Sequence, residues 1–189
     1  MSGEYNLPWF PAWGIEFENP IENLNEIISR FNQIRPNNRW SLVSFDSVAS
    51  EFHLWSTWMS VVSNELKNAM IAKSVDVEFL RLLSGNRQIS KAFEITGLAQ
   101  GDKNAWIISI PKKTAEVNHE FGLISKNIYL DLEDDANKLI QKLGSSLLPK
   151  RPTPNQSGLI KLGIELNDLN LTLGEKEDLF IGSMALTDI

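Results

Sequence analysis

The sequence contains no cysteine and only two histidines, His53 and His119. The absence of cysteine excludes disulfide bonds, thiolate catalysis and cysteine-ligated zinc, and it fits a reducing compartment. The two histidines do not stand at the spacing of a metal site, and no H-E-x-x-H motif occurs. We therefore predict that both histidines are structural residues with satisfied hydrogen bonds. We expect no metal and no cofactor.

Long hydrophobic runs are also missing. No apolar stretch approaches the roughly 18 residues that a membrane-spanning helix needs. The first 13 residues, MSGEYNLPWFPAW, lack the basic start and the apolar core of a signal peptide. We expect a cytoplasmic protein that does not contact a membrane.

Recognisable catalytic motifs are absent. The chain has no G-x-x-x-x-G-K-[ST] phosphate loop, no G-x-G-x-x-G turn and no G-x-S-x-G elbow. The acidic run DLEDD at 131–135 lacks the glycine bend and spaced oxygens of a calcium loop, and acids at a helix start suit the helix dipole. No residue is proposed as catalytic, and we predict that the chain is not an enzyme.

Charge is distributed unevenly along the chain. The formal net charge is −6, which argues against a protein that coats nucleic acid with its whole surface. Between Lys67 and Lys91, however, five basic residues face only two acids, whereas six acids and one lysine follow from Glu165 onwards. Two faces of opposite sign would suit two different partners. Scattered, solvated surface charge is the alternative.

The hydrophobic pattern predicts an α+β fold in one domain spanning 1–189. Strands are expected at 14–18, 39–45 and 105–110, and the ambiguous stretch 112–130 offers short strands in FGLIS and NIYLDL. Three helices between the second and third strands argue against a regular parallel doubly wound sheet. We expect about four strands with helices packed against them. The expected helices cover 20–34, 47–69, 74–83, 87–97, 131–143, 158–164 and 175–188.

One predicted helix carries a long apolar stripe with alternating spacings of three and four. We predict that this stripe packs in the core, because a coiled-coil dimer usually needs three or four sustained heptads. The stripe consists of Phe52, Trp55, Met59, Val62, Leu66 and Ala69.

Two segments fall outside the regular elements. Residues 1–13 form an N-terminal arm whose prolines and aromatics predict an extended chain that lays Trp9, Phe10 and Trp13 on the core. An exposed recognition arm is the alternative. Residues 149–157, PKRPTPNQS, have the composition of an internal loop or linker.

The stretch 79–98, FLRLLSGNRQISKAFEITGL, joins two apolar, helix-spaced runs through the polar turn SGNRQ. Around it, residues 68–98 resemble the smallest core subunit of the KEOPS complex, the family of the human protein TPRKB, in an archaeal-like form. The likeness covers about 39–111 well, includes FDSVASEFHL at 45–54, and extends loosely to the C-terminal MALTDI. The matching residues are Ala72-Lys73-Ser74, Glu78, Ser84-Gly85, Arg87-Gln88-Ile89, Ala92 and Gly97.

The resemblance implies a mixed α/β domain with a mainly antiparallel sheet and an accessory, non-catalytic role. Members of this family bind and stimulate a small RIO-like kinase that acts as an ATPase. They also help to hold tRNA through its acceptor 3′ end, while the complex makes threonylcarbamoyladenosine next to the anticodon. The N-terminal arm and residues 112–157 depart from the family pattern. The competing interpretation is a stand-alone small-ligand-binding or enzymatic α+β domain unrelated to tRNA.

The polar turn offers a candidate RNA-binding site. Two helix starts, at Ser74 and near Arg87, present free backbone N–H groups and positive dipole ends, and nearby basic and amide side chains add charge and donors. Arg87 and Gln88 could instead cap local carbonyls and pair with Glu78 or Glu94. The candidate RNA-binding residues are Lys73, Ser74, Arg87, Gln88 and Lys91.

The last helix offers a candidate kinase-binding surface. A helix face is a common docking element, and the resemblance places part of the kinase contact at the C-terminus. The alternative is that the same apolar residues close the core. The candidate kinase-binding residues, expected to lie partly outward, are Ile181, Met184, Ala185 and Leu186.

Overall fold

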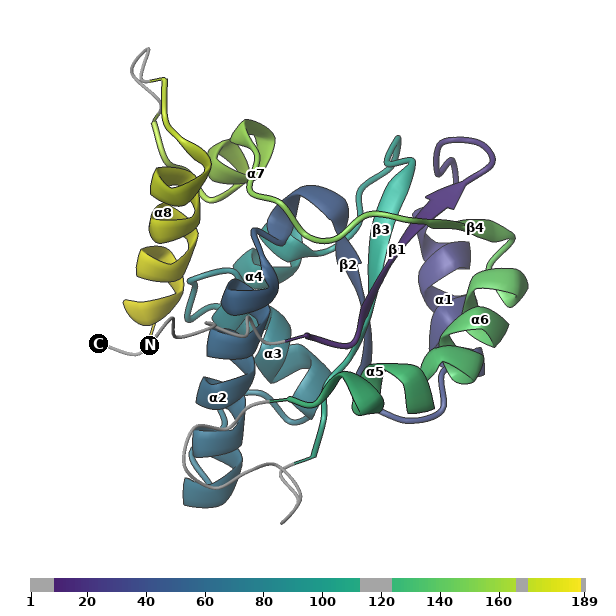
Figure 1. Ribbon diagram of the computed structural model, residues 1–189, viewed down its shortest axis with the longest axis horizontal. Coiled ribbons are helices and arrows are strands. Elements are labelled where there is room, and N and C mark those ends of the chain that lie inside the picture. The colour runs from purple at the N-terminus through teal and green to yellow at the C-terminus, as the bar shows by residue number, and fades with distance from the viewer. Residues whose placement is uncertain (1–8, 113–123, 166–169, 188–189) are drawn as a thin grey trace, which may run out of the picture.

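The computed structural model describes residues 9–112, 124–165 and 170–187 of the 189-residue chain. Its centre is a four-stranded sheet in the order β2-β3-β1-β4, in which every neighbouring pair is antiparallel (Figure 1). The predicted α+β class with a mainly antiparallel sheet is therefore confirmed. The strands are β1 (Ala12–Phe17), β2 (Trp40–Ser44), β3 (Asn104–Ser109) and β4 (Ser145–Leu148).

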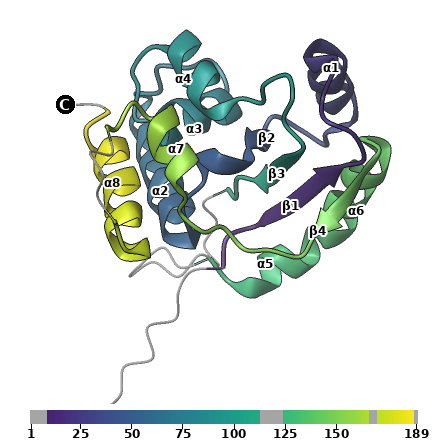
Figure 2. The same cartoon turned by 90° about the horizontal axis from the view of Figure 1, so that it is seen from above.

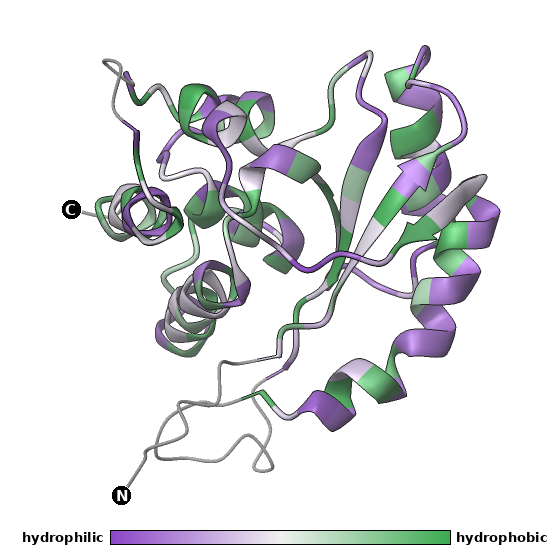
Figure 3. Ribbon diagram, turned by 45° about the horizontal axis from the view of Figure 1, so that its top comes forward, coloured by the Kyte–Doolittle hydropathy of each residue, from purple (hydrophilic) through white to green (hydrophobic). Residues whose placement is uncertain are grey.

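Helices cover both faces of the sheet (Figures 1 and 2). Helices α2, α3 and α4 lie on one face and α1 and α6 on the other, while α7 and α8 extend the α2 side. In Figure 3 the ribbons of α1 and α6 alternate between hydrophobic and hydrophilic residues, as amphipathic helices do. The helices are α1 (Leu24–Ile34), α2 (Glu51–Lys67), α3 (Val75–Leu83), α4 (Ile89–Thr96), α5 (Lys126–Asp131), α6 (Glu133–Lys142), α7 (Gln156–Lys161) and α8 (Leu173–Ala185), with a short 3-10 turn η1 (Phe45–Ser47).

The strand β3 shows why the sheet needs two helical layers. Its residues Trp106 and Ile108 pack with α2 and α3, whereas Ala105 and Ile107 pack with α1 and α6. Side chains alternate between the faces of a strand, so a strand covered on both sides is apolar throughout. This explains the continuous run AWIISI and places β3 as a central strand, as predicted.

Helices α7 and α8 are held to the rest of the domain by a small separate cluster of buried residues, Ala49, Leu159 and Phe180. Gly158 makes this contact possible. A Cβ atom at that position would overlap the backbone oxygen of Asp46, so α7 touches η1 backbone to backbone. The docked α7 then supports α8.

The N-terminal arm packs onto the domain over the residues that the structure describes. Phe10 and Trp13 are buried, and Trp9 is half-buried, as the sequence predicts. Arg151, from the 149–157 loop, holds the arm by donating to the backbone oxygens of Phe10 (2.7 Å) and Ala12 (2.5 Å). It also pairs with Glu51 and lies 4.6 Å above the Trp9 ring. The loop is therefore an anchored element. The part of the arm before residue 9 lies outside the described residues.

In the second half of the chain, one predicted strand is wrong and one strand was not predicted. Residues 127–132, expected as a strand, lie mostly in the short helix α5, whose Ser125 cap accepts from the Asn127 N–H at 3.2 Å. The fourth strand is instead β4, which pairs with β1 at the sheet edge and has no buried residue, two being exposed and two half-buried. A four-residue edge strand buries too little to leave a hydrophobic pattern. Most of FGLIS lies outside the described residues.

The prediction that the apolar stripe forms the core face of α2 is only partly correct. Val62 is buried, and the half-buried Trp55 and Met59 pack against the core. Phe52 and Leu66, however, are 39% and 66% exposed, and Ala69 is exposed. The core face lies next to the stripe on the helix. Two of its members are polar and were therefore not recognised: the Thr57 hydroxyl donates to the His53 backbone oxygen at 2.8 Å, and His53 Nδ1 accepts from the Ala49 N–H at 3.3 Å. The buried residues of α2 are His53, Leu54, Thr57, Trp58, Val61 and Val62.

Candidate functional site

The polar turn SGNRQ begins as a left-handed helix ending. Gly85 has a φ of 66°, which a glycine adopts at no steric cost. The Gly85 N–H donates to the Leu82 oxygen at 3.0 Å, and the Asn86 N–H reaches back to the Arg81 oxygen at 3.4 Å. These two bonds form a Schellman motif, which satisfies the last carbonyls of α3. The carbonyls therefore do not need the side chains of the two following residues, Arg87 and Gln88.

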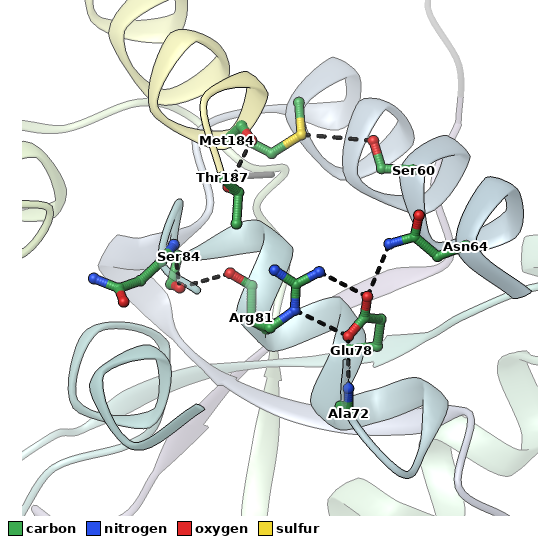
Figure 4. Close-up of polar contacts among 9 residues, drawn as sticks. Ser60, Asn64, Ala72, Glu78, Arg81, Ser84, Met184 and Thr187 are labelled. Carbon is green, nitrogen blue, oxygen red and sulfur yellow. Dashed lines mark hydrogen bonds and ion pairs between the residues drawn. The ribbon is translucent and has the colours of Figure 1, made fainter. Parts of the chain in front are cut away.

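A buried ion pair fixes α3 against α2 (Figure 4). Arg81 Nη2 lies 2.7 Å from Glu78 Oε1, and both side chains are fully buried. Glu78 also accepts from the Asn64 amide of α2 at 2.9 Å and from the Ala72 N–H at 3.0 Å. Burial alone would raise the pKa of Glu78, but the hydrogen bonds from these three partners hold it below its usual value. Glu78, the acid of the family motif, therefore has a structural role and does not pair with Arg87.

The candidate RNA-binding residues lie mostly on the surface. Lys73, Arg87, Gln88 and Lys91 are exposed, and Ser74 is half-buried. Lys91 pairs with Glu94 at 2.7 Å, whereas Arg87 and Lys73 form no ion pair with any residue that the structure describes. The alternative in which Arg87 is neutralised by Glu78 or Glu94 is therefore wrong for the described chain. Gln88 is the N-cap residue of α4 and makes no side-chain capping bond.

The two helix starts are not brought together. Ser74 precedes α3, and Arg87 follows its other end, so the two positions are separated by the nine residues of the helix. At 1.5 Å per residue this is about 13 Å. A single phosphate therefore cannot contact both helix starts, and a ligand that reaches both has to be an extended strand. Ser74 instead lines a cleft with Phe93, near the far end of α4.

The last helix lies over the polar turn and against α2. Figure 4 shows its C-terminal end beside α2 and α3, with the Ser60 hydroxyl directed at the Met184 sulfur, 3.9 Å away. Among the candidate kinase-binding residues, Ala185 is exposed, Leu186 is 67% exposed and Ile181 is half-buried. The expectation for Met184 is wrong: it is only 7% exposed, because it packs onto α2.

Two apolar residues that the sequence placed in the core add a second exposed apolar area on α2. Phe52 and Leu66 are exposed there, and the Phe52 ring stacks on the half-buried Trp55 at 5.5 Å. On α2, His53 and Ser60 contact α8. Large exposed apolar faces on neighbouring helices are typical of protein-interaction surfaces. The spacing pattern identified this stripe but could not show which way it faces.

Of the two histidines, the structure describes one. His53 is buried, and burial lowers its pKa to about 3. Its burial confirms that His53 is a structural residue. Its Nε2 atom has no hydrogen-bond partner in the described chain, so the prediction that its hydrogen bonds are satisfied is wrong. His119 lies outside the described residues. No helix within the described ranges is long and apolar enough to cross a membrane.

The geometry defines a helix-covered, antiparallel α+β domain with apolar faces exposed on two neighbouring helices. The chain belongs to the family described as kinase binding protein CGI-121, whose family model matches residues 17–188 of 189. This confirms the resemblance to the TPRKB family, and binding of a kinase is the property that the family description states. A search of curated proteins finds no match for the chain.

Proposed function

We propose that this chain is the non-catalytic regulatory subunit of a cytoplasmic KEOPS complex, which makes threonylcarbamoyladenosine in tRNA. In this role it binds and activates the RIO-like kinase subunit, an ATPase, and helps to hold the 3′ end of the tRNA. The family description supports the kinase partner. The tRNA partner rests on the resemblance and on the exposure of the basic residues.

The observation that carries the proposal is the exposed apolar surface on α2 and α8. Leu186 and Leu66 are each about two-thirds exposed, and Phe52 and Ala185 are also exposed. Burying a leucine side chain in an interface contributes roughly 1.5–3 kcal/mol. A kinase surface that covers these residues would remove the unfavourable free energy of their exposure to water. The exposure of Ala185 and Leu186 supports docking over core closure.

Co-purification with the kinase tests this half of the proposal. The isolated chain and the kinase are expected to elute as one complex and to hydrolyse ATP faster than the kinase alone. Separate elution, with unchanged ATP hydrolysis, would refute it. Turnover of a small molecule by the isolated chain would instead favour the competing enzymatic domain.

The RNA half rests on Arg87, an exposed guanidinium that no described acid neutralises. Arg87→Glu is expected to weaken tRNA binding and to reduce the log–log salt dependence by about 0.7–0.9 for each phosphate that the variant no longer neutralises. Arg30→Glu is the matched control, because Arg30 is an exposed arginine on α1 that pairs with Glu26. Normal tRNA binding by a folded Arg87→Glu variant would exclude this residue from the RNA site.

A further inference from the structure

The outer edge of strand β2 lies in a cleft of about 270 Å³. Helix α1 forms one wall of the cleft, and α3 and α4 form the other. The apolar lining of the walls includes Ile28, Phe31, Leu80 and Phe93, and β2 contributes Ser41 and Leu42. Within the described ranges no strand pairs with β2 on this side. An unpaired strand edge is a template on which another extended chain can pair.

Leu42 presents the unpaired backbone groups of this edge. Hydrogen bonds between antiparallel strands alternate, so every second residue of an edge strand directs its N–H and C=O away from the sheet. The Ile110 N–H donates to the Arg39 oxygen at 2.8 Å, so the odd-numbered residues of β2 face β3 and Leu42 faces outward. Outside the sheet, neither backbone group of Leu42 has a backbone partner in the part of the chain that the structure describes.

The other outward-facing residue near the cleft, Trp40, is already satisfied. Its N–H donates to the Asn37 oxygen at 3.3 Å, and its oxygen accepts from Arg35 Nη1 at 2.9 Å. Leu42 is only 5% exposed, and buried backbone groups nearly always have hydrogen-bond partners. A single residue of an incoming antiparallel strand would satisfy both groups, because a hydrogen-bonded pair of residues exchanges both bonds.

A second unsatisfied group lies in the same cleft. Asp76 is 7% exposed, and its Oδ1 atom is buried and has no partner in the described chain, whereas Oδ2 accepts from Arg35 Nη1 at 2.5 Å. Since Arg35 already balances the carboxylate charge, an uncharged N–H donor suits Oδ1 better than a second cation. Such a donor can belong to the same incoming strand as the group that pairs with Leu42.

The alternation of side chains along a strand gives this incoming segment a pattern. The residue opposite Leu42 directs its side chain to the same face as Leu42, which packs with Phe31 of α1. The adjacent residue directs its side chain to the other face, toward α3, where Asp76 lies. The pattern is therefore an apolar residue followed by an amide-bearing one, asparagine or glutamine.

Charge at the cleft favours an acidic segment. Lys73 is exposed, directly precedes Ser74 of the cleft wall, and forms no ion pair with any residue in the described ranges. The Arg35–Asp76 pair is neutral overall, so Lys73 leaves the site with a positive charge. The walls also favour a single extended chain over the β2 edge of a second copy, because the same helices flank β2 in that copy and would collide with them.

We propose that β2 takes an extended, acidic segment of a protein partner, which pairs antiparallel with Leu42 and adds a strand to the sheet. The segment carries an apolar residue opposite Leu42, an asparagine or glutamine beside it that donates to Asp76, and an acidic residue near Lys73. This site is separate from the proposed kinase surface on α2 and α8, and the proposal does not depend on RNA binding.

The test selects binders for the full wild-type chain from a library of random linear peptides and measures the affinity of the best peptide by fluorescence anisotropy. Phe93→Glu is expected to weaken binding at least about tenfold, because it places a negative charge on the cleft wall. Phe52→Glu is the matched control, since Phe52 is similarly exposed on α2, and it should stay within about twofold of wild type. Methylation of one peptide nitrogen at a time should weaken binding at alternate positions only.

Amide hydrogen exchange of the isotope-labelled wild-type chain gives a readout that needs no variant. The peptide is expected to slow exchange of the Leu42 amide at least about tenfold. The proposal is overturned if no peptide is selected, if the peptide binds Phe93→Glu like wild type, or if it leaves Leu42 exchange unchanged. Protection of Leu42 by self-association, or by single-stranded RNA and no peptide, would also overturn it, because another occupant would then cover the edge.

Discussion

A methyl group on Gly85 would lie 2.8 Å from the backbone oxygen of Ser183 and would also overlap the Ser183 hydroxyl. The turn that precedes the candidate RNA-binding residues therefore contacts the helix that carries the candidate kinase-binding residues. Only a residue without a side chain can provide both this close approach and the left-handed φ of 66°. The two proposed binding surfaces are therefore linked by the packing of Gly85 against Ser183.

Gly85→Ala is expected to destabilise the domain by about 2–4 kcal/mol, from left-handed backbone strain together with overlap with α8. The measurement is urea unfolding followed by circular dichroism. Gly182→Ala, one residue before Ser183, is the control. No atom lies within 4 Å of the added methyl group there, so this variant should gain about 0.5–1 kcal/mol in helix stability. Equal stability of the two variants would contradict the packing described here.

Breaking the buried Glu78–Arg81 pair should be costly. Glu78→Gln removes the carboxylate charge of a fully buried ion pair, and we expect a loss of about 3–5 kcal/mol at pH 7. Since the pKa of Glu78 is lowered in the folded state, its contribution is present above pH 4.5 and is lost as the pH falls through the folded-state pKa. Glu94→Gln, in the exposed Lys91–Glu94 pair, should cost less than about 1 kcal/mol.

His53 should make the domain sensitive to mild acid. Its pKa is 6.5 when unfolded and about 3 when folded, so below pH 6.5 the unfolded chain binds a proton that the folded chain does not. The free energy of unfolding should therefore fall by up to about 1.4 kcal/mol per pH unit from this residue as the pH drops.

Chemical unfolding between pH 5 and 7 tests this prediction against His53→Asn, whose amide oxygen can still accept a hydrogen bond. The variant should be less stable at pH 7 but should depend less on pH over this range. His119 is present in both proteins, so its contribution cancels. Parallel pH profiles for the two proteins would show that His53 does not cause the dependence.

The anchored loop predicts a fourth stability effect. Arg151→Ala removes the ion pair with Glu51, the two backbone hydrogen bonds to the arm and the contact with the Trp9 ring, and we expect a loss of about 3 kcal/mol. Burial already raises the pKa of Glu51 despite the opposing effect of Arg151, so removal of the arginine should raise it further. Tryptophan fluorescence should shift as Trp9 and Trp13 gain solvent. Lys150→Ala, at the exposed neighbour, should change stability by less than about 0.5 kcal/mol.

The sequence predicts those features of the fold that local chemistry determines. The left-handed ending at Gly85, the continuous apolar strand 105–110 and the helix that buries Leu139 and Ile140 follow from backbone preference and periodicity, and all three are confirmed. The sequence also places Arg87 correctly near the start of a helix, and the structure shows that it is exposed.

The orientation of α2 could not be predicted in this way. The apolar stripe runs from the exposed Phe52 and Leu66 to the buried Val62, and the buried face also includes the polar His53 and Thr57, so the periodicity of apolar residues did not identify the buried face. The cleft was equally hidden, because its walls come from three separate segments: α1, β2 and the α3–α4 pair. Arg151 looked like part of a linker because its partners, Glu51 and the arm, are distant in sequence.

The most direct test of the central claim is the affinity of the proposed partner, the RIO-like kinase, for surface variants of α8 and α2, measured by isothermal titration calorimetry. Leu186→Glu, at the exposed C-terminal end, is predicted to weaken binding at least tenfold, since the interface gives up about 1.4 kcal/mol or more of apolar burial and gains a charge. Leu173→Glu, similarly exposed at the other end of the same helix, should bind like wild type. Equal affinities for wild type, Leu186→Glu and Leu66→Glu would contradict the assignment of the kinase surface to α2 and α8.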